Sequence, residues 1–178
     1  MAMSRTLIRT YGREDKLSPD EVITQVHRRI LSDTQRGIFL TVVFGVLDSN
    51  THTFTYTNAG HNPPFLIGEA DDGIHLSNLE KTGPLVGIFG DSNWGSQTLE
   101  IKPGEVLVLY TDGISEAQNR EDAFYGIDRL ERALMRGYDL KAEAMRNALL
   151  EDVQTFMGLA PRLDDITLVV IARNLDEN

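Results

Sequence analysis

The chain has 178 residues, a length typical of one domain with its own hydrophobic core. Apolar residues make up 41% and charged residues 25%, which excludes wholesale disorder. The formal charge of −10 disfavours general binding to nucleic acids, and the absence of cysteine excludes disulfides, zinc–thiolate sites and cysteine nucleophiles. No apolar run reaches the about 20 residues of a membrane span and no signal-peptide pattern begins the chain, so we expect a soluble, cytoplasmic domain.

Two helices are predicted in the N-terminal part of the chain. Residues 1–11 are good helix formers, and residues 18–34 carry apolar side chains at helical spacing. Ser18 suits the N-cap of the second helix and Pro19 its first position, while Glu21 completes a capping box with Ser18. A polar break lies between the two segments, so we expect two separate helices.

The pattern after the second helix is that of strands. Residues 38–47 are almost continuously apolar and rich in β-branched side chains, which predicts a strand buried on both faces. Residues 51–59 alternate in polarity and form a predicted hairpin with that strand through the turn at 48–50. A short strand is expected at 65–67. Residues 68–93 are rich in Gly, Asp, Asn and Ser, which predicts mostly loop with short strand pieces.

The second half of the chain mixes strands and helices. Strands are predicted at 94–101 and 105–110, and a last buried strand at 166–172. One predicted helix includes residues 127–134 and a longer one spans 140–157. Helices near both ends with many strands between them indicate the α+β class, with helices layered on an antiparallel sheet.

Acidic residues lie at the ends of the two most apolar late strands. Asp112 closely follows one of these strands, and Asp164 and Asp165 directly precede the other. If the strands are antiparallel neighbours, the carboxylates meet at one edge and repel one another unless Mg²⁺ or Mn²⁺ neutralises them. Gly113 would let the backbone approach a ligand closely. The alternative is an ordinary turn at Asp112 and a solvated loop or cap at the other two.

A second candidate site lies in the loop that contains Asn58 and His61. These side chains could hydrogen-bond a phosphate or orient a water, and His61 could transfer a proton near neutral pH. Alternatively, both residues cap a strand end and the prolines that follow only redirect the chain. His27, His52 and His75 show no pattern of partners and are interpreted as surface or strand residues.

Five segments, taken together and in order, resemble one protein family. They are Thr41 at the start of the apolar strand, Asn58–Pro64, Gly83–Gly87, Leu109–Ala117 and Asp164–Val170. They resemble the bacterial serine/threonine phosphatases of the stage II sporulation protein E type, which belong to the metal-dependent type 2C phosphatases. The resemblance covers nearly the whole chain.

The resemblance implies an antiparallel β-sandwich flanked by helices and a protein phosphatase that acts through a metal-activated water. Two Mn²⁺ or Mg²⁺ ions are implied, which lower the pKa of the water and screen the phosphate charge. By motif, Asp112 and Asp164 match metal ligands, with Gly113 and Asp165 beside the metal site. The implied substrate is the phosphoserine or phosphothreonine of a signalling protein such as an anti-sigma-factor antagonist.

One segment of the family pattern is not found in this sequence. The family carries an Asp-x-x-Gly-His-Gly type segment before its first long helix, and the Asp-Gly of that segment supplies ligands to both metals. We therefore expect residues 1–178 to be a single phosphatase-like domain that lacks N-terminal strands and part of the metal site. Missing strands would expose a sheet edge, so self-association into a homo-oligomer is also expected.

Two further interpretations of the function stay open. The domain could be a catalytically incomplete phosphatase-like module that binds a signalling partner. It could also be a sheet-based interaction domain whose acidic edge is only solvated. The substitution Asp112→Asn separates the three interpretations, because only the metal-dependent phosphatase predicts a loss of Mn²⁺-dependent turnover.

Overall fold

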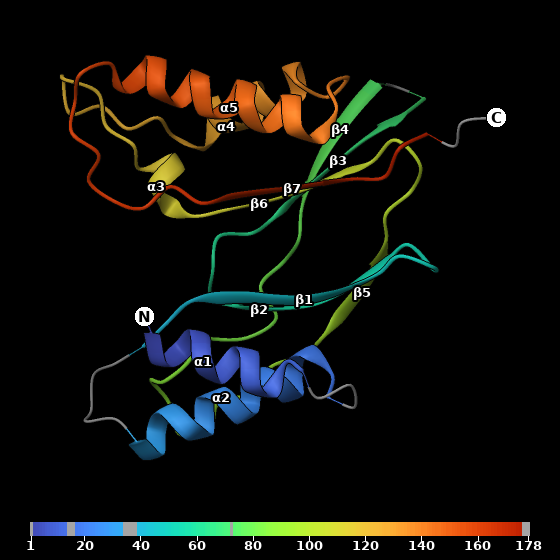
Figure 1. The fold of residues 1–178 in the computed structure, drawn as a ribbon, viewed down its shortest axis with the longest axis vertical. Helices are drawn as coiled ribbons and strands as arrows, with labels where there is room; N and C mark the ends of the chain where they lie inside the picture. The colour runs from blue at the N-terminus through green and yellow to red at the C-terminus, as the bar shows by residue number, and fades with distance from the viewer. Residues whose placement is uncertain (1, 14–16, 34–38, 72, 176–178) are drawn as a thin grey trace. The chain divides into compact units, whose positions relative to one another are not determined.

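The computed structural model describes residues 2–13, 17–33, 39–71 and 73–175. They form two compact units, the first made of residues 1–61 and 80–100 and the second of residues 62–79 and 101–178. In each unit helices pack on a sheet whose neighbouring strands are all antiparallel (Figure 1). The α+β class is thus confirmed, whereas the single domain stays a prediction.

The first unit has two helices on a three-stranded sheet. The helices are α1 (Ala2–Tyr11) and α2 (Pro19–Asp33), and the strands are β1 (Val42–Asp48), β2 (Thr53–Ala59) and β5 (Gln97–Glu100). The strand order is β1-β2-β5, so β2 is the central strand. The buried core of this unit consists of Val22, Ile23, Val26, Ile30, Ala59, Val86 and Trp94.

The start of α2 matches the predicted cap in part. The Ser18 backbone N–H donates to the Glu21 carboxylate at 2.8 Å, as a capping box requires. The Ser18 hydroxyl also donates to this carboxylate, at 3.0 Å. The predicted helix is confirmed to Asp33, while Thr34 lies outside the described residues.

His27 was predicted at the surface or in a strand, and this was wrong. It lies on the inner face of α2 and is buried, with its ring edge-on to Trp94 at 4.9 Å between ring centroids. Its Nδ1 accepts a hydrogen bond from the Gly87 N–H at 3.1 Å. Burial lowers the pKa of His27, and the charge of Arg28 lowers it further.

The second unit contains a four-stranded sheet with helices on one face (Figure 1). Its strands are β3 (Phe65–Ala70), β4 (Gly73–Asn78), β6 (Val106–Tyr110) and β7 (Leu168–Ala172), in the order β4-β3-β6-β7. Among the described residues, no helix of either unit is both long and apolar enough to cross a membrane.

Three helices complete the second unit. They are the short α3 (Asp112–Ser115), α4 (Ile127–Arg136) and α5 (Ala142–Met157). The two longer helices confirm the predicted ones, and α5 ends at Gly158, whose φ of +57° suits glycine. Sheet and helices share a buried core that includes Phe65, Ile67, Val108, Tyr110, Ile114, Tyr125, Leu130, Leu134, Met145, Leu149 and Val153.

The first strand is not buried on both faces, so that prediction was wrong. β1 begins at Val42 and lies at the edge of its sheet, and the predicted start at Ile38 lies outside the described residues. Val46 is 50% exposed and Leu47 44% exposed. A continuous apolar run is typical of a central strand, but the same run occurs here at an edge, which sequence periodicity does not distinguish.

Three other strand predictions need correction. The strand predicted at 65–67 continues to Ala70 as β3, and the strand pieces predicted in the following segment form β4, whose Gly73 pairs with Ala70. β5 begins only at Gln97, because Trp94 leaves the strand path to donate its indole N–H to the Pro84 carbonyl at 2.7 Å. β7 lies at a sheet edge and is only partly buried.

Candidate metal centre at the carboxylate edge

The strands β6 and β7 bring the predicted acidic residues to one edge of the four-stranded sheet. They are antiparallel neighbours, and Tyr110 at the end of β6 pairs with Leu168 at the start of β7. The chain therefore leaves β6 towards Asp112 at the same edge at which it enters β7 from Asp164 and Asp165. We call this end of the sheet, with these three aspartates, the carboxylate edge.

The hydroxyl of Thr111 connects the two segments of the carboxylate edge. It donates to the carbonyl of Asp165 and accepts from the N–H of Thr167, both at 3.0 Å. The Thr111 N–H also donates to the Thr167 carbonyl at 3.1 Å, which extends the strand pairing by one residue. Thr111 thus holds the backbone next to Asp112 against the backbone that carries Asp164 and Asp165.

Gly113 is required at this edge for steric reasons. A Cβ atom at this position would lie 2.4 Å from the carbonyl oxygen of Asp165, closer than real Cβ contacts. Gly113 is buried, and only a residue without a side chain lets the two backbones approach to this distance. The close approach that the sequence predicts for Gly113 is therefore made to the backbone of the second acidic segment.

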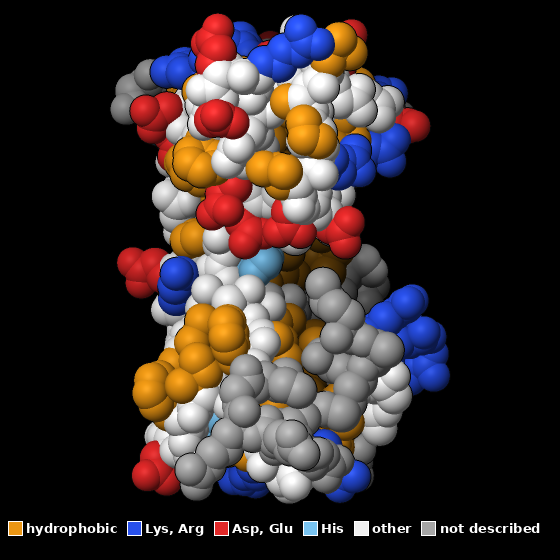
Figure 2. Space-filling model, turned by 90° about the vertical axis from the view of Figure 1, so that its left-hand side faces the viewer, with side chains coloured by type: hydrophobic (Ala, Val, Ile, Leu, Met, Phe, Trp, Pro, Cys, Tyr) orange, Lys and Arg blue, Asp and Glu red, His pale blue; other side chains and the backbone are white. Residues whose placement is uncertain are grey.

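The carboxylates themselves face solvent. Asp112 is the first residue of α3 and is exposed, as are Asp164 and Asp165. The Asp165 N–H donates to the Asp164 carboxylate at 2.6 Å, which leaves most of the acceptor positions of that group available. Figure 2 shows acidic side chains gathered on the face on which α3 lies, with hydrophobic side chains beside them.

Oxygen ligands of this kind suit Mg²⁺ and Mn²⁺, so the donor set fits these ions in its chemistry. The number of these ligands is small, because the described part of the chain contains no cluster of three or more His, Cys, Asp or Glu that could hold a metal. Asp112 and Asp164 would therefore hold an ion together with non-protein ligands such as water or phosphate oxygens.

The loop of the second candidate site is organised by Asn58. Its side chain is buried, and its Oδ1 accepts from the His61 N–H at 2.9 Å. The backbone of Asn58 pairs with Thr82, whose hydroxyl accepts from the Asn58 N–H at 3.0 Å. His61 contacts Thr41, with 3.0 Å between Nδ1 and Oγ1. This geometry agrees with the structural alternative for Asn58, and a role in substrate binding stays a prediction.

Sequence reasoning missed three contributors around the carboxylate edge. Thr111 and the short helix α3 both lie inside the segment Leu109–Ala117, but four helical residues are too few to show a period. Arg162 lies near Asp164, and both line a cavity of about 160 Å³ beside the carboxylate edge. Its only signal in the sequence is a positive charge two residues before the Asp-Asp pair.

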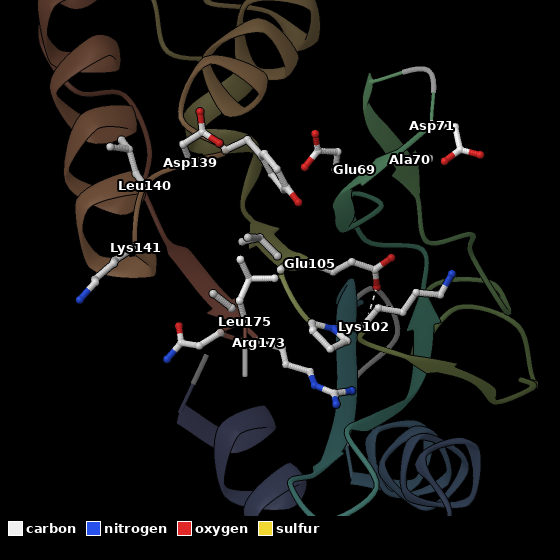
Figure 3. A pocket seen from close by; sticks show the side chains of 16 residues that line it. Glu69, Ala70, Asp71, Lys102, Glu105, Asp139, Leu140, Lys141, Arg173 and Leu175 are labelled. Carbon is white, nitrogen blue, oxygen red and sulfur yellow. Dashed lines mark hydrogen bonds between the residues drawn. The ribbon is translucent and has the colours of Figure 1, made fainter. Parts of the chain in front are cut away.

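A larger cavity of about 660 Å³ lies at the opposite end of β6 and β7 (Figure 3). Its lining carries charges of both signs, from Glu69, Glu105, Lys102 and Arg173 among others. Two of these charged side chains have local partners. The Glu105 carboxylate accepts from the backbone N–H of Lys102 at 2.8 Å, and the Arg173 guanidinium donates to the Ile101 carbonyl at 2.9 Å. The cavity contains none of the motif residues, so the candidate centre is the carboxylate edge.

A family model described as stage II sporulation protein E (SpoIIE) matches residues 1–174. The chain is 34% identical to protein IcfG of Synechocystis over 138 residues, which are 78% of this chain and 21% of that protein. It is 24% identical to phosphoserine phosphatase RsbU of Bacillus subtilis over 162 residues, which are 91% of this chain and 47% of that protein. The chain thus spans less than half the length of these curated relatives.

Solved structures share the fold. The PP2C domain of SiaA from Pseudomonas aeruginosa matches with a TM-score of 0.78 at 18% identity, covering 96% of this chain and 68% of that one. RsbX, solved in complex with magnesium, matches with a TM-score of 0.62 at 15% identity, covering 95% of this chain and 70% of that one. With the family match over residues 1–174, these findings confirm the resemblance: the chain belongs to the stage II sporulation protein E family and has a PP2C-type phosphatase fold.

Proposed function

We propose that this domain is a metal-dependent protein phosphatase that hydrolyses phosphoserine or phosphothreonine with an activated water. The observation that carries the proposal is the joining of two acidic segments by Thr111 and Gly113. The family supports it, since the relative RsbU is named a phosphoserine phosphatase.

The proposed roles follow from the placement of each side chain. Asp112 and Asp164 hold a divalent ion, Mn²⁺ or Mg²⁺, through their exposed carboxylates, and Asp165 and Gly113 position the second segment against the first. When bound, such an ion supplies Lewis-acid activation of the attacking water and neutralises phosphoryl charge. Without a cation, the clustered carboxylates repel a phosphate dianion.

The proposed substrate is a phosphorylated regulatory protein of the anti-sigma-factor antagonist class. Support comes from the family and from the phosphatases RsbU and RsbP among the relatives. Such a substrate controls transcription, so the proposed place of action is the cytoplasm.

Calorimetric titration with Mn²⁺ tests the proposed metal site. The unaltered chain should bind Mn²⁺ and Asp112→Asn should not, because the substitution removes an anionic ligand. Asp139→Asn is the matched control, since this exposed aspartate lines the cavity at the opposite end of β6 and β7. Equal binding by all three proteins would place the ion elsewhere.

Catalysis is tested separately, by Mn²⁺-dependent release of phosphate from p-nitrophenyl phosphate. Turnover that is lost in Asp112→Asn supports the phosphatase. Binding of Mn²⁺ without turnover would favour the second candidate function, a catalytically incomplete module that binds a signalling partner. The small donor set of the described residues is the observation that favours this alternative.

We also propose that the domain self-associates through the edge of β1. In the described part of the chain this strand pairs only with β2, and its one charge is at its last residue, Asp48, while Val42–Leu47 contain neither charge nor proline. Natural edge strands use such residues to prevent pairing with another chain.

A further inference from the structure

A cavity of about 160 Å³ adjoins the carboxylate edge within the second unit. Gly113 and Asp164 line one part of it, and Phe124, Met157 and Leu163 supply apolar side chains. Arg162 also lines it. A cavity of roughly 150 Å³ is large enough for a benzene ring, so this one has room for one side chain of a bound peptide.

Two apolar residues of the lining are exposed to solvent. Phe124 is 58% exposed and Leu163 67% exposed, although both are large hydrophobic residues. Met157, by contrast, is buried and belongs to the core of the second unit. The cavity thus has an apolar floor continuous with the core and an apolar rim in water, an arrangement that favours a large apolar group from a partner.

Arg162 gives the cavity a charge opposite to that of its neighbours. The nearby groups Asp112, Glu116, Asp164 and Asp165 are acidic, and all are exposed. Within the described residues, Arg162 makes no hydrogen bond or ion pair to any of them. A planar guanidinium with unengaged donors suits the oxygens of a phosphoryl group.

From these observations we propose that the cavity is a substrate subsite. It binds a large apolar side chain next to the phosphorylated residue, while Arg162 contacts the phosphoryl group. The inference rests on the proposed phosphatase function, because the cavity shares Asp164 with the proposed metal site. The substrate class is thereby narrowed to phosphoproteins with an apolar residue beside the phosphoserine or phosphothreonine.

Fluorescence anisotropy tests the subsite in the chain with Mn²⁺ present, because without a cation the carboxylates repel a phosphoryl group. The labelled peptides carry the phosphonate analogue of phosphoserine, which is not hydrolysed. Three peptides differ only in carrying Leu before, Leu after, or Ala on both sides of this residue. One Leu peptide should bind about tenfold more tightly than the Ala peptide, the effect expected for burying one apolar side chain.

Two pairs of variants assign this effect to the cavity. Phe124→Ala should abolish the preference for Leu, whereas Met135→Ala, which shortens an exposed apolar side chain of α4, should keep it. Arg162→Gln should weaken binding of the phosphorylated peptide but not of its unphosphorylated form. Arg132→Gln, at an exposed position of α4, should weaken neither.

The outcomes separate the subsite from the proposed function. Equal binding of all peptides, absence of binding, or a Leu preference that survives Phe124→Ala would overturn the subsite, even if p-nitrophenyl phosphate is hydrolysed. A Leu preference that depends on Phe124, together with weaker binding of the phosphorylated peptide by Arg162→Gln but no hydrolysis of p-nitrophenyl phosphate, would retain the subsite and reject the phosphatase.

Discussion

Gly113 shows how one residue sets the geometry of the carboxylate edge. Because an added Cβ would lie 2.4 Å from the Asp165 oxygen, Gly113→Ala must push the two acidic segments apart. We expect the free energy of unfolding to fall by about 2 kcal/mol, as for other overpacked sites, and the affinity for Mn²⁺ to fall with it.

Urea unfolding and Mn²⁺ calorimetry measure these two effects of Gly113→Ala. Gly90→Ala is the matched control, because a Cβ at Gly90 would have no neighbour within 4 Å. Gly113→Ala with unchanged stability and metal affinity would contradict the role given to the close approach.

His27 should make the stability of the chain depend on pH. Burial holds its pKa below the ordinary value of 6.5, so the unfolded chain binds a proton more readily than the folded chain. The stabilising contribution is complete above about pH 6.5 and is lost as the pH falls through the lower pKa of the folded state.

Urea unfolding at pH 7.5 and pH 5 measures this dependence. His27→Gln keeps an acceptor for the Gly87 N–H and should show a smaller loss of stability at the lower pH. His75→Gln, at an exposed position of β4, should lose as much stability between pH 7.5 and pH 5 as the unaltered chain. The same loss in all three proteins would show that other groups control acid sensitivity.

At the scale of elements, the edge strand β1 predicts self-association. Val46→Lys places a charge on this strand and should shift the chain towards monomer, because a lysine disfavours pairing with a second copy. Val169→Lys is matched to it, since Val169 is 46% exposed on β7, the edge of the other sheet. Sedimentation equilibrium over a range of concentrations distinguishes them. A chain that stays monomeric at every concentration would refute the proposal.

Long elements could be predicted from the sequence and short ones could not. α2 and α5 show three or more turns of apolar periodicity, and the Ser18 cap and Gly158 mark their ends. The β3–β4 hairpin was predicted only as a short strand and separate strand pieces, because turn residues at its tip dominate the local composition. α3 is a single turn that follows a strand directly, so it carries no periodic signal.

At the scale of the whole molecule, the candidate site was predicted from motifs and the strands from periodicity. The metal-site hypothesis required the two late apolar runs to be antiparallel neighbours, and β6 and β7 meet that condition. The contacts of Thr111 and Arg162 were not predicted, because they depend on how loops fold back in three dimensions. The division into two compact units also has no counterpart in composition, since no linker separates them in the sequence.

The pairing of β6 with β7 also has a consequence for protein synthesis. Asp112 and Asp164 are separated by 52 positions, the difference between their numbers, and β7 is the last strand among the described residues. A ribosome completes Asp112, α4 and α5 before it reaches the second acidic segment. The carboxylate edge therefore forms only after residues 164 and 165 have been translated, and a nascent chain that stops before residue 164 lacks the second acidic segment.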